Sequence, residues 1–295
     1  GFNQFIAIGD KKGDGVKLFD NFSQGVLTAR DAWCYNPSSE AVSANMQRMI
    51  DFYNSEVKRF NQTVLGLAKK DREIMTDGFI DTNPEKISWS RFLKQELTKR
   101  KEFNFEKKCL VKSLLRPFTK QWLYFNRQLN EMVYQMPKIF PSPKHMNRAI
   151  MVKARWNQGQ LALITDHIPG FSPDGGEQCF PLYLYESSEE TTPTKTKGTP
   201  DLFTPSTEQS APGQPTYTRK DAITDEGLQH FQSAYPGENI GKVDLFYYVY
   251  GLLHSPDYRE RYADNLSKEL PRIPAVKTAR DFWHFTQAGR ALAEL

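Results

Sequence analysis

The sequence of 295 residues contains few cysteines, and they lie far apart. Cys34, Cys109 and Cys179 are an odd number, and none belongs to a Cys-x-x-Cys pair or lies beside a His-x-x-x-His pair. This spacing argues against a disulfide framework and against a structural zinc site. We therefore expect three buried thiols in a reducing cytoplasm, and no metal site.

Long hydrophobic runs are also missing. No stretch of 18 apolar residues occurs, which argues against a membrane-spanning helix. The first 15 residues lack the basic and apolar regions of a secretory signal peptide, and they lack an initiator Met. With 39% hydrophobic and 25% charged residues, the chain can bury a sizeable core. We expect a monomeric cytoplasmic fragment of a longer polypeptide, without a membrane partner.

Catalytic motifs are absent as well. Residues 9–15 are rich in glycine but lack the spacing of a phosphate-binding Walker loop, and neither G-x-G-x-x-G nor G-x-S-x-G occurs. The chain has no Pro-Pro pair for an adenine methyltransferase loop, and no Pro-Asp is followed by the Glu-x-Lys of common nucleases. Its five histidines are scattered, and Asp166-His167 precedes a turn at Ile168-Pro169. We expect no catalytic residue in this chain.

Positive charge, by contrast, is concentrated in one part of the sequence. Residues 1–160 hold 27 Lys and Arg against 16 Asp and Glu, and the remaining residues hold 12 against 19. Within 86–155 the count is 17 basic against 4 acidic, interleaved with aromatic residues. A basic, aromatic-rich segment is typical of a face that binds DNA or RNA, since phosphate contacts give affinity for any sequence. The alternative is a solvated lysine-rich surface over an ordinary aromatic core.

Hydrophobic periodicity and turn residues predict an α+β fold. It consists of a mixed N-terminal region with short, mainly antiparallel strands and helices, followed by an all-helical C-terminal bundle. Of the 32 residues in 187–218, 20 are Ser, Thr, Pro or Gly, which predicts a flexible insertion. We therefore divide the chain into a basic α/β region (1–186), the insertion (187–218) and a helical subdomain (219–295). Predicted helices cover 39–60, 88–100, 243–254, 256–270 and a segment after Thr278; predicted strands cover 5–8, 121–125, 149–154, 161–165 and 179–185.

Several segments together resemble a known family. They are GVLTARDAWCYN (25–36), NMQRMIDFYNSEV (45–57), ISWSRFLKQEL (87–97), SLLRPFTKQWLYFNR (113–127), ITDHIP (164–169), QCFPLYLYE (178–186), DLFYYVYGLLHSPDYRERYADNLSKELPRIP (244–274) and AGRALAEL (288–295). They resemble the C-terminal specificity region of single-polypeptide type ISP restriction–modification enzymes. The resemblance covers nearly the whole chain except 187–218.

The resemblance implies a target recognition domain that reads double-stranded DNA. In such enzymes the same polypeptide carries a nuclease, a helicase-like ATPase and an N6-adenine methyltransferase. The present chain is expected to position DNA for methylation and ATP-dependent restriction by those domains. Its expected partners are duplex DNA and the adjoining methyltransferase domain. No cofactor is expected in this fragment, whereas S-adenosylmethionine, ATP and Mg²⁺ are expected for the parent chain.

Charge and resemblance together select the candidate DNA-binding residues. The strongest segment, RPFTKQW (116–122), is basic, contains a turn and leads into a predicted strand. The family often has Asp at Thr119 and Arg at Gln121, so contacts from these two positions stay open. Arg116 could instead be a buried residue that fixes a turn, and Arg30 could pair with Asp31. The candidates are Arg30, Arg91, Lys94, Arg100, Lys101, Arg116, Thr119, Lys120, Gln121, Tyr124, Arg127, Lys144, Arg148, Lys153, Arg155 and Asn157.

Two alternative functions remain at this point. A protein–protein docking module could use the same basic face to bind an acidic partner domain. The second alternative is a small-molecule enzyme with unrecognised chemistry. The missing catalytic motifs argue against it. Steep salt dependence of duplex binding would distinguish DNA recognition from docking.

Overall fold

The computed structural model describes residues 1–171, 176–188 and 216–295. It contains helices and short strands, so the predicted α+β class is confirmed. The chain divides into two compact units, which we name the helical unit and the hairpin unit. The helical unit comprises Gly1–Ser23, Gln135–Asp166 and Gly176–Leu295; the hairpin unit comprises Gln24–Tyr134 and His167–Gly175.

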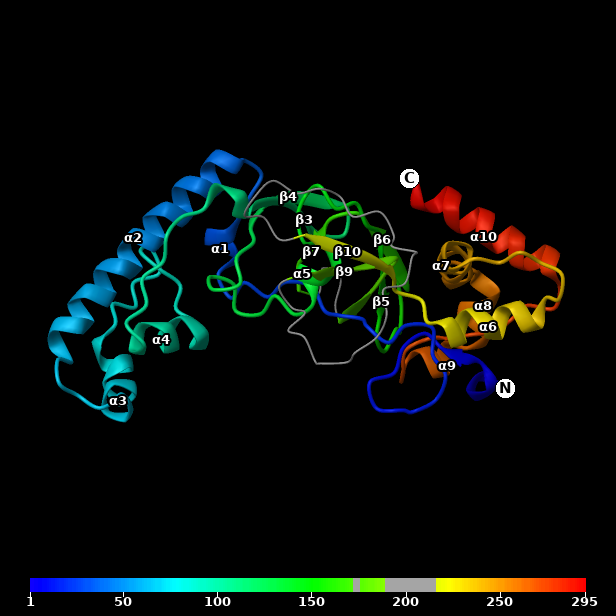
Figure 1. Cartoon of the computed structure of the whole chain (residues 1–295), viewed down its shortest axis with the longest axis horizontal. Coiled ribbons are helices and arrows are strands. Elements are labelled where there is room, and N and C mark those ends of the chain that lie inside the picture. Colours follow the sequence, from blue (N-terminus) through cyan, green and yellow to red (C-terminus); the bar gives the residue numbers. More distant parts are fainter. Residues whose placement is uncertain (172–175, 189–215) are drawn as a thin grey trace, which may run out of the picture. The chain divides into compact units, whose positions relative to one another are not determined.

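The hairpin unit combines helices with a four-stranded sheet (Figure 1). Its elements are α1 (Asp31–Cys34), β2 (Tyr35–Asn36), α2 (Ser39–Thr63), α3 (Lys69–Phe79), α4 (Arg91–Thr98), η2 (Lys107–Cys109), β3 (Leu110–Arg116), β4 (Thr119–Tyr124) and β7 (Ile168–Pro169). The strand order is β2-β4-β3-β7. Strand β4 pairs antiparallel with both neighbours, and β3 pairs in parallel with β7. The β3–β4 hairpin is therefore held at the centre of the sheet.

Helix α2 confirms the predicted helix over 39–60. Its apolar residues recur at helical spacing and are buried along one face, from Val42 to Phe60. Its start is capped by Ser38, whose hydroxyl oxygen accepts a hydrogen bond from the Ala41 amide at 3.1 Å. Such a cap satisfies one of the free amides at the start of a helix.

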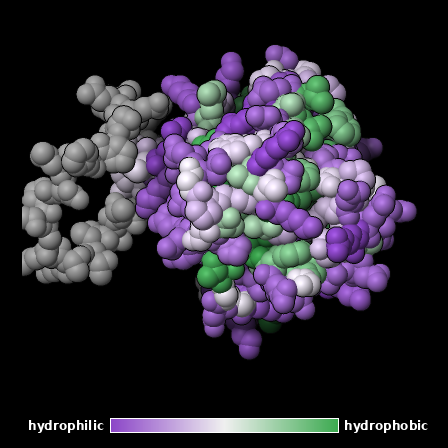
Figure 2. Space-filling view, turned by 90° about the vertical axis from the view of Figure 1, so that its right-hand side faces the viewer, coloured by the Kyte–Doolittle hydropathy of each residue, from purple (hydrophilic) through white to green (hydrophobic). Residues whose placement is uncertain are grey.

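The helical unit combines short antiparallel sheets with the remaining helices of the described residues. Its elements are η1 (Phe2–Gln4), β1 (Ile6–Ala7), α5 (Met136–Ile139), β5 (Ala149–Lys153), β6 (Ala162–Thr165), β8 (Glu177–Pro181), β9 (Tyr183–Ser187), β10 (Tyr217–Asp221), α6 (Asp225–Ala234), α7 (Lys242–Leu253), α8 (Pro256–Arg261), α9 (Ala263–Leu266), β11 (Arg272–Ile273) and α10 (Ala279–Ala293). The sheets have the orders β6-β5-β8, β10-β9 and β1-β11. Hydrophilic residues cover most of the face that Figure 2 presents, with smaller hydrophobic patches between them.

Helix α7 forms the centre of the helical unit. Its residues from Leu245 to Leu253 are all buried, as expected for a helix that is apolar on nearly every face. It packs against α10 through two glycines: a Cβ atom at Gly251 would lie 2.1 Å from the Phe285 carbonyl oxygen, and one at Gly289 would lie 2.0 Å from the Tyr247 carbonyl oxygen. Only glycine allows the two backbones to approach this closely.

The C-terminal region differs from the sequence prediction in two details. The helix predicted over 256–270 ends at Arg261, and α9 follows after Tyr262, whose ring packs against Phe2 and Phe5 at 5.3 and 5.6 Å between centroids. A short strand, β11, also lies within the region predicted to be wholly helical and pairs with β1. Pro271 precedes this strand, and proline disfavours a continuing helix.

The two units do not follow the three predicted segments. Strand residues such as Ile150 and Phe180 share one core with Leu245 and Phe246 of α7, so the middle of the chain belongs with the C-terminal helices. Most of the predicted insertion, 189–215, lies outside the described residues; the strands that flank it, β9 and β10, pair with each other.

The difference in net charge is smaller between the two structural units than between residues 1–160 and 161–295 of the sequence. The hairpin unit holds 19 Lys and Arg against 14 Asp and Glu, and the helical unit holds 20 against 21. The net charges are therefore +5 and −1. The change arises because residues 135–155, with five basic and no acidic residues, belong to the helical unit.

Candidate nucleic-acid interface

The base of the β3–β4 hairpin is fixed inside the hairpin unit. Leu114, Leu123 and Tyr124 are buried. The Ser113 hydroxyl donates a hydrogen bond to the Ile168 carbonyl at 2.6 Å, and the Tyr124 hydroxyl accepts one from the Glu106 amide at 2.9 Å. Burial raises the pKa of Tyr124 above its usual value, so the phenol stays neutral. Tyr124, a predicted DNA-binding residue, is thus an anchor of the hairpin within the fold.

The tip of the hairpin projects exposed residues. Arg116 pairs with Thr119, so Pro117 and Phe118 form a two-residue loop, and the register shifts between Leu114 and Arg116. Proline fixes its own φ near −65°, which suits the first position of such a turn. Phe118 has φ 63° and its side chain is 87% exposed. A left-handed backbone is costly for a bulky residue, and at this exposed position burial of the ring does not offset that cost.

The same hairpin also carries cationic side chains. The Lys112 amine lies 4.4 Å from the centre of the Trp122 ring, directly across the ladder. Arg116 is exposed and donates a hydrogen bond to the carbonyl of Leu115 at 2.9 Å; among the described residues it has no carboxylate partner. Lys120 is exposed on β4, and Gln121 beside it is half-buried. The hairpin therefore offers hydrogen-bond donors and positive charge on a rigid two-stranded support.

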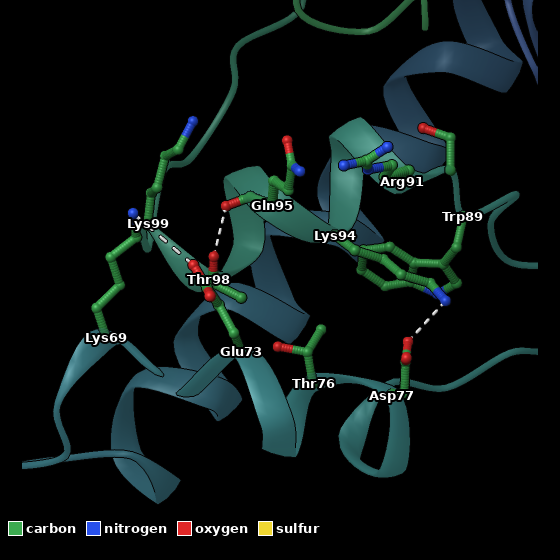
Figure 3. A pocket seen from close by; sticks show the side chains of 11 residues that line it. Lys69, Glu73, Thr76, Asp77, Trp89, Arg91, Lys94, Gln95, Thr98 and Lys99 are labelled. Atoms are coloured by element: carbon green, nitrogen blue, oxygen red, sulfur yellow. Dashed lines mark hydrogen bonds and ion pairs between the residues drawn. The ribbon is translucent and has the colours of Figure 1, made fainter. Parts of the chain in front are cut away.

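A cleft between α3 and α4 collects further predicted residues. Its volume is about 630 Å³, and Arg91 and Lys94 line it together with Lys69 and Lys99. Figure 3 shows side chains of the two helices facing one another across the cleft. Lys94 pairs with Asp77 at 2.7 Å. Carboxylates such as Asp77 therefore already neutralise part of the positive charge in this cleft.

Arg30 lies inside the hairpin unit rather than on its surface. The side chain is buried, and its guanidinium donates hydrogen bonds to the carbonyls of Thr28 (3.0 Å), Ser88 (3.2 Å) and Leu129, and to the Ser90 hydroxyl (2.6 Å). The pairing with Asp31 that the sequence suggested is not formed among the described residues. Burial lowers the pKa of Arg30 below its usual value. Arg30 thus connects three chain segments, and this burial argues against a direct DNA contact.

The comparisons with known proteins agree with this architecture. Residues 17–295 match the model of the family described as "Type ISP C-terminal specificity domain". The chain belongs to this family. Among the curated proteins, no match was found.

Three solved structures resemble the specificity domain over nearly its whole length. They are a nuclease-deletion mutant of the Type ISP restriction–modification enzyme LlaGI with a DNA substrate mimic (TM-score 0.75, 30% identity), a DrdV–DNA complex (0.76, 29%) and the ATP-dependent Type ISP enzyme LlaBIII bound to DNA (0.73, 30%). These matches cover 99%, 99% and 100% of this chain, but only 23%, 25% and 16% of those proteins.

The remaining predicted residues of the specificity domain fall into both units. In the hairpin unit, Arg100, Lys101, Thr119 and Arg127 are exposed. In the helical unit, Lys144, Arg155 and Asn157 are exposed and Lys153 is half-buried. Arg148 is held internally, since its guanidinium bonds to the Tyr247 hydroxyl at 2.9 Å and to Glu294 at 2.7 Å. The hairpin is thus the place where predicted residues gather most closely.

Sequence reasoning overlooked some residues of the specificity domain that the geometry brings forward. Lys112 lies on the hairpin, and Lys69 and Lys99 line the cleft. The most prominent is Phe118, which was read only as part of a basic turn. The available signal was Pro117, which favours a turn at Pro117-Phe118, although the sequence alone does not show which residues of that turn are exposed.

The cysteines of the specificity domain lie in its interior. All three cysteines are buried and free, as predicted, and burial raises the pKa of Cys34 to about 12. No group of three or more His, Cys, Asp or Glu is placed to hold a metal ion within residues 1–171, 176–188 and 216–295. In the same ranges, no helix is long and apolar enough to cross a membrane.

Proposed function

We propose that this specificity domain binds duplex DNA and reads its target sequence, with the β3–β4 hairpin as its main contact. The observation that carries this proposal is the hairpin itself: a buried base and a tip at which Arg116, Phe118 and Thr119 are exposed. The DNA present in the related LlaGI, DrdV and LlaBIII structures supports it.

The dimensions and chemistry of the hairpin suit the major groove. That groove admits a two-stranded ribbon, and each base pair shows a distinct pattern of donors and acceptors there. Arg116 is suited to guanine, since a guanidinium can donate two hydrogen bonds to its O6 and N7 atoms. Lys112 and Lys120 would contact phosphates, which fix the register of the protein on the duplex.

Salt-dependent binding tests this function. The duplex is first selected by the chain from a randomised 24-base-pair pool, and its Kd is then measured at increasing salt. We expect the double variant Arg116→Ala, Lys120→Ala to weaken binding. The slope of log K against log salt should fall by about 1 for the lost phosphate contact of Lys120, whereas the loss of Arg116 should relax the choice of base. The matched control is Lys277→Ala, Arg280→Ala, which removes two exposed charges from the helical unit. Absence of duplex binding at low salt, or equal effects of the two pairs, would refute the proposal.

The catalytic steps belong, in this proposal, to other parts of a longer parent chain. The support is that the specificity domain matches only 16–25% of the three solved proteins. A methyltransferase region using S-adenosylmethionine and a motor region using ATP and Mg²⁺ would act on DNA that this domain positions. Mapping N6-methyladenine made by the parent chain, with and without the Arg116→Ala, Lys120→Ala pair, tests this division of labour. We expect the variant to lose methylation at the target, and unchanged methylation would contradict it.

The adjoining methyltransferase region is also a proposed partner of this domain. Leu65 is 81% exposed and Ile74 of α3 is 71% exposed, and a contact with the methyltransferase region would bury apolar side chains such as these. We propose that the chain is otherwise monomeric. Light scattering of the chain alone and with the separately expressed methyltransferase region tests both points. A stable dimer of the chain alone would contradict the first, and no complex with the methyltransferase region would contradict the second.

A further inference from the structure

We propose that Phe118 is a wedge that inserts its ring between neighbouring base pairs of bound DNA. This inference rests on the proposed function and goes further, since it assigns to one side chain the local unstacking of the duplex. Minor-groove and architectural DNA-binding proteins unstack base steps with apolar wedges, among them Phe. At this hairpin the ring would enter the stack from the major groove instead.

The first argument is that the ring of Phe118 is exposed to solvent. It is 87% exposed, and no other aromatic ring among the described residues packs against it. By contrast, Phe105, which lies near the opposite end of the hairpin, packs its ring against that of Tyr124 at 5.3 Å. A large apolar side chain placed in water at the tip of a hairpin gains nothing from the folded state alone.

The second argument is that its backbone conformation works against a phenylalanine. At φ 63° a glycine or an asparagine would be accommodated without comparable strain. Pro117 before it and the irregular register after Leu114 fix this turn, so the ring is presented in a limited set of directions. Such preorganisation lowers the entropy lost when the ring becomes ordered on binding.

The third argument is the chemistry around the ring. Arg116 and Thr119 pair directly across the loop that carries Phe118, and Lys120 follows. Hydrogen-bond donors on both sides of an apolar ring match the pattern of a duplex, in which phosphates flank a stack of apolar bases. A docking surface for a protein would bury such a ring among apolar neighbours, whereas this tip exposes polar residues.

Fluorescence of 2-aminopurine tests this inference, because that base brightens when it is unstacked. The probe is the duplex that the chain itself selects from the randomised pool, with 2-aminopurine placed in turn at each adenine. With the native chain we expect a rise in fluorescence at one or two adjacent positions. Phe118→Ala should abolish this rise and weaken binding about tenfold, whereas Phe118→Leu, which keeps an apolar wedge, should retain most of it.

Two controls separate the possible failures. Melting temperature shows whether each variant folds, and substitution of an exposed tip residue should change it little. If no duplex is selected or bound at low salt, the proposed function itself fails. The wedge alone is refuted if the duplex is bound but 2-aminopurine fluorescence rises at no position. It is also refuted if Phe118→Ala raises this fluorescence as much as the native chain does. If Phe118→Ala bound the duplex as tightly as the native chain but no longer formed a complex with the methyltransferase region, the ring would be assigned to protein docking instead.

Discussion

In the helical unit, the ring of Phe282 stacks on that of Tyr248 at 4.5 Å and is wholly buried, whereas in the hairpin unit the ring of Phe118 is 87% exposed. The first ring stabilises the packing of α7 against α10. The second lies largely in solvent and occupies a backbone conformation that bulky residues disfavour. The comparison shows that a phenylalanine stabilises the core in the helical unit, whereas a phenylalanine in the hairpin unit is exposed and can contact a ligand.

Cationic residues differ in a similar way. In the helical unit Arg148 and Arg290 form ion pairs with Glu294 at 2.7 Å and with Asp244 at 2.8 Å. In the hairpin unit Arg30 is buried and hydrogen-bonded, while Arg116 has no carboxylate partner among the described residues. The number of basic residues in a segment therefore says less about binding than the partners that each of them already has.

The largest effect is expected at the contact between α7 and α10. Gly289→Ala places a Cβ atom 2.0 Å from the Tyr247 carbonyl oxygen, so the helices must move apart. We expect a loss of about 3 kcal/mol in the free energy of unfolding, measured by urea denaturation. Gly78→Ala, in α3, is the matched control, because nothing lies within 4 Å of its Cβ position. Equal midpoints for Gly289→Ala and the native chain would show that the close helix contact is not required.

A comparison of two arginines sharpens the distinction between structural and exposed cations. Arg30→Ala leaves buried carbonyl groups without donors, and we expect it to cost about 3 kcal/mol of stability. Arg116→Ala, at an exposed tip, should change stability by less than about 0.5 kcal/mol but weaken duplex binding. Thermal unfolding and a binding titration of both variants provide the measurement. If the stability losses were reversed, the assignment of the two roles would be wrong.

The sequence predicted the elements whose signals are local. The helix from Ser39, the buried helix before His254 and the restart at Ser255-Pro256 depend on spacing and caps, and these were recognised. It did not predict α3, in which only Thr76 is buried, because few of the residues of this helix are apolar. Strand β3 was missed for a different reason: its length is set by pairing with β4 and β7, which are distant contacts.

The candidate site was predicted in part. Segment 116–122 was recognised as the strongest candidate, and it forms the tip of the hairpin and β4. The sequence could not show that Arg30 and Tyr124 point into the fold, because burial depends on partners such as Leu129 and Glu106. Nor could it show that Phe118 is exposed, since alternation in a strand does not tell which residues form the loop.

A smaller effect is expected from relief of strain at the hairpin tip. Asparagine tolerates a positive φ better than phenylalanine, so Phe118→Asn should stabilise the folded chain by about 0.5–1 kcal/mol. Phe118→Ala removes the same ring but keeps a residue that disfavours this conformation, and it should stabilise less. Chemical denaturation of the two variants checks the order. If Phe118→Asn and Phe118→Ala were equally stable, backbone strain at position 118 would not contribute to the difference between this ring and the rings of the helical unit.

The smallest effect concerns His254, which follows α7 and lies 4.7 Å from the ring of Tyr250. Burial, and secondarily the charge of Arg259, lower the pKa of His254 below its usual value. The unfolded chain therefore binds a proton at a higher pH than the folded chain does. As the pH falls through about 6.5, protonation of the unfolded state should reduce the stability of the helical unit. His254→Gln should make thermal stability between pH 7 and 5 less dependent on pH than in the native chain, whereas His284→Gln, at an exposed position of α10, serves as the matched control. If the pH dependence persists in His254→Gln, another group must cause it, and the neutral state of this histidine would not contribute to the packing around α7.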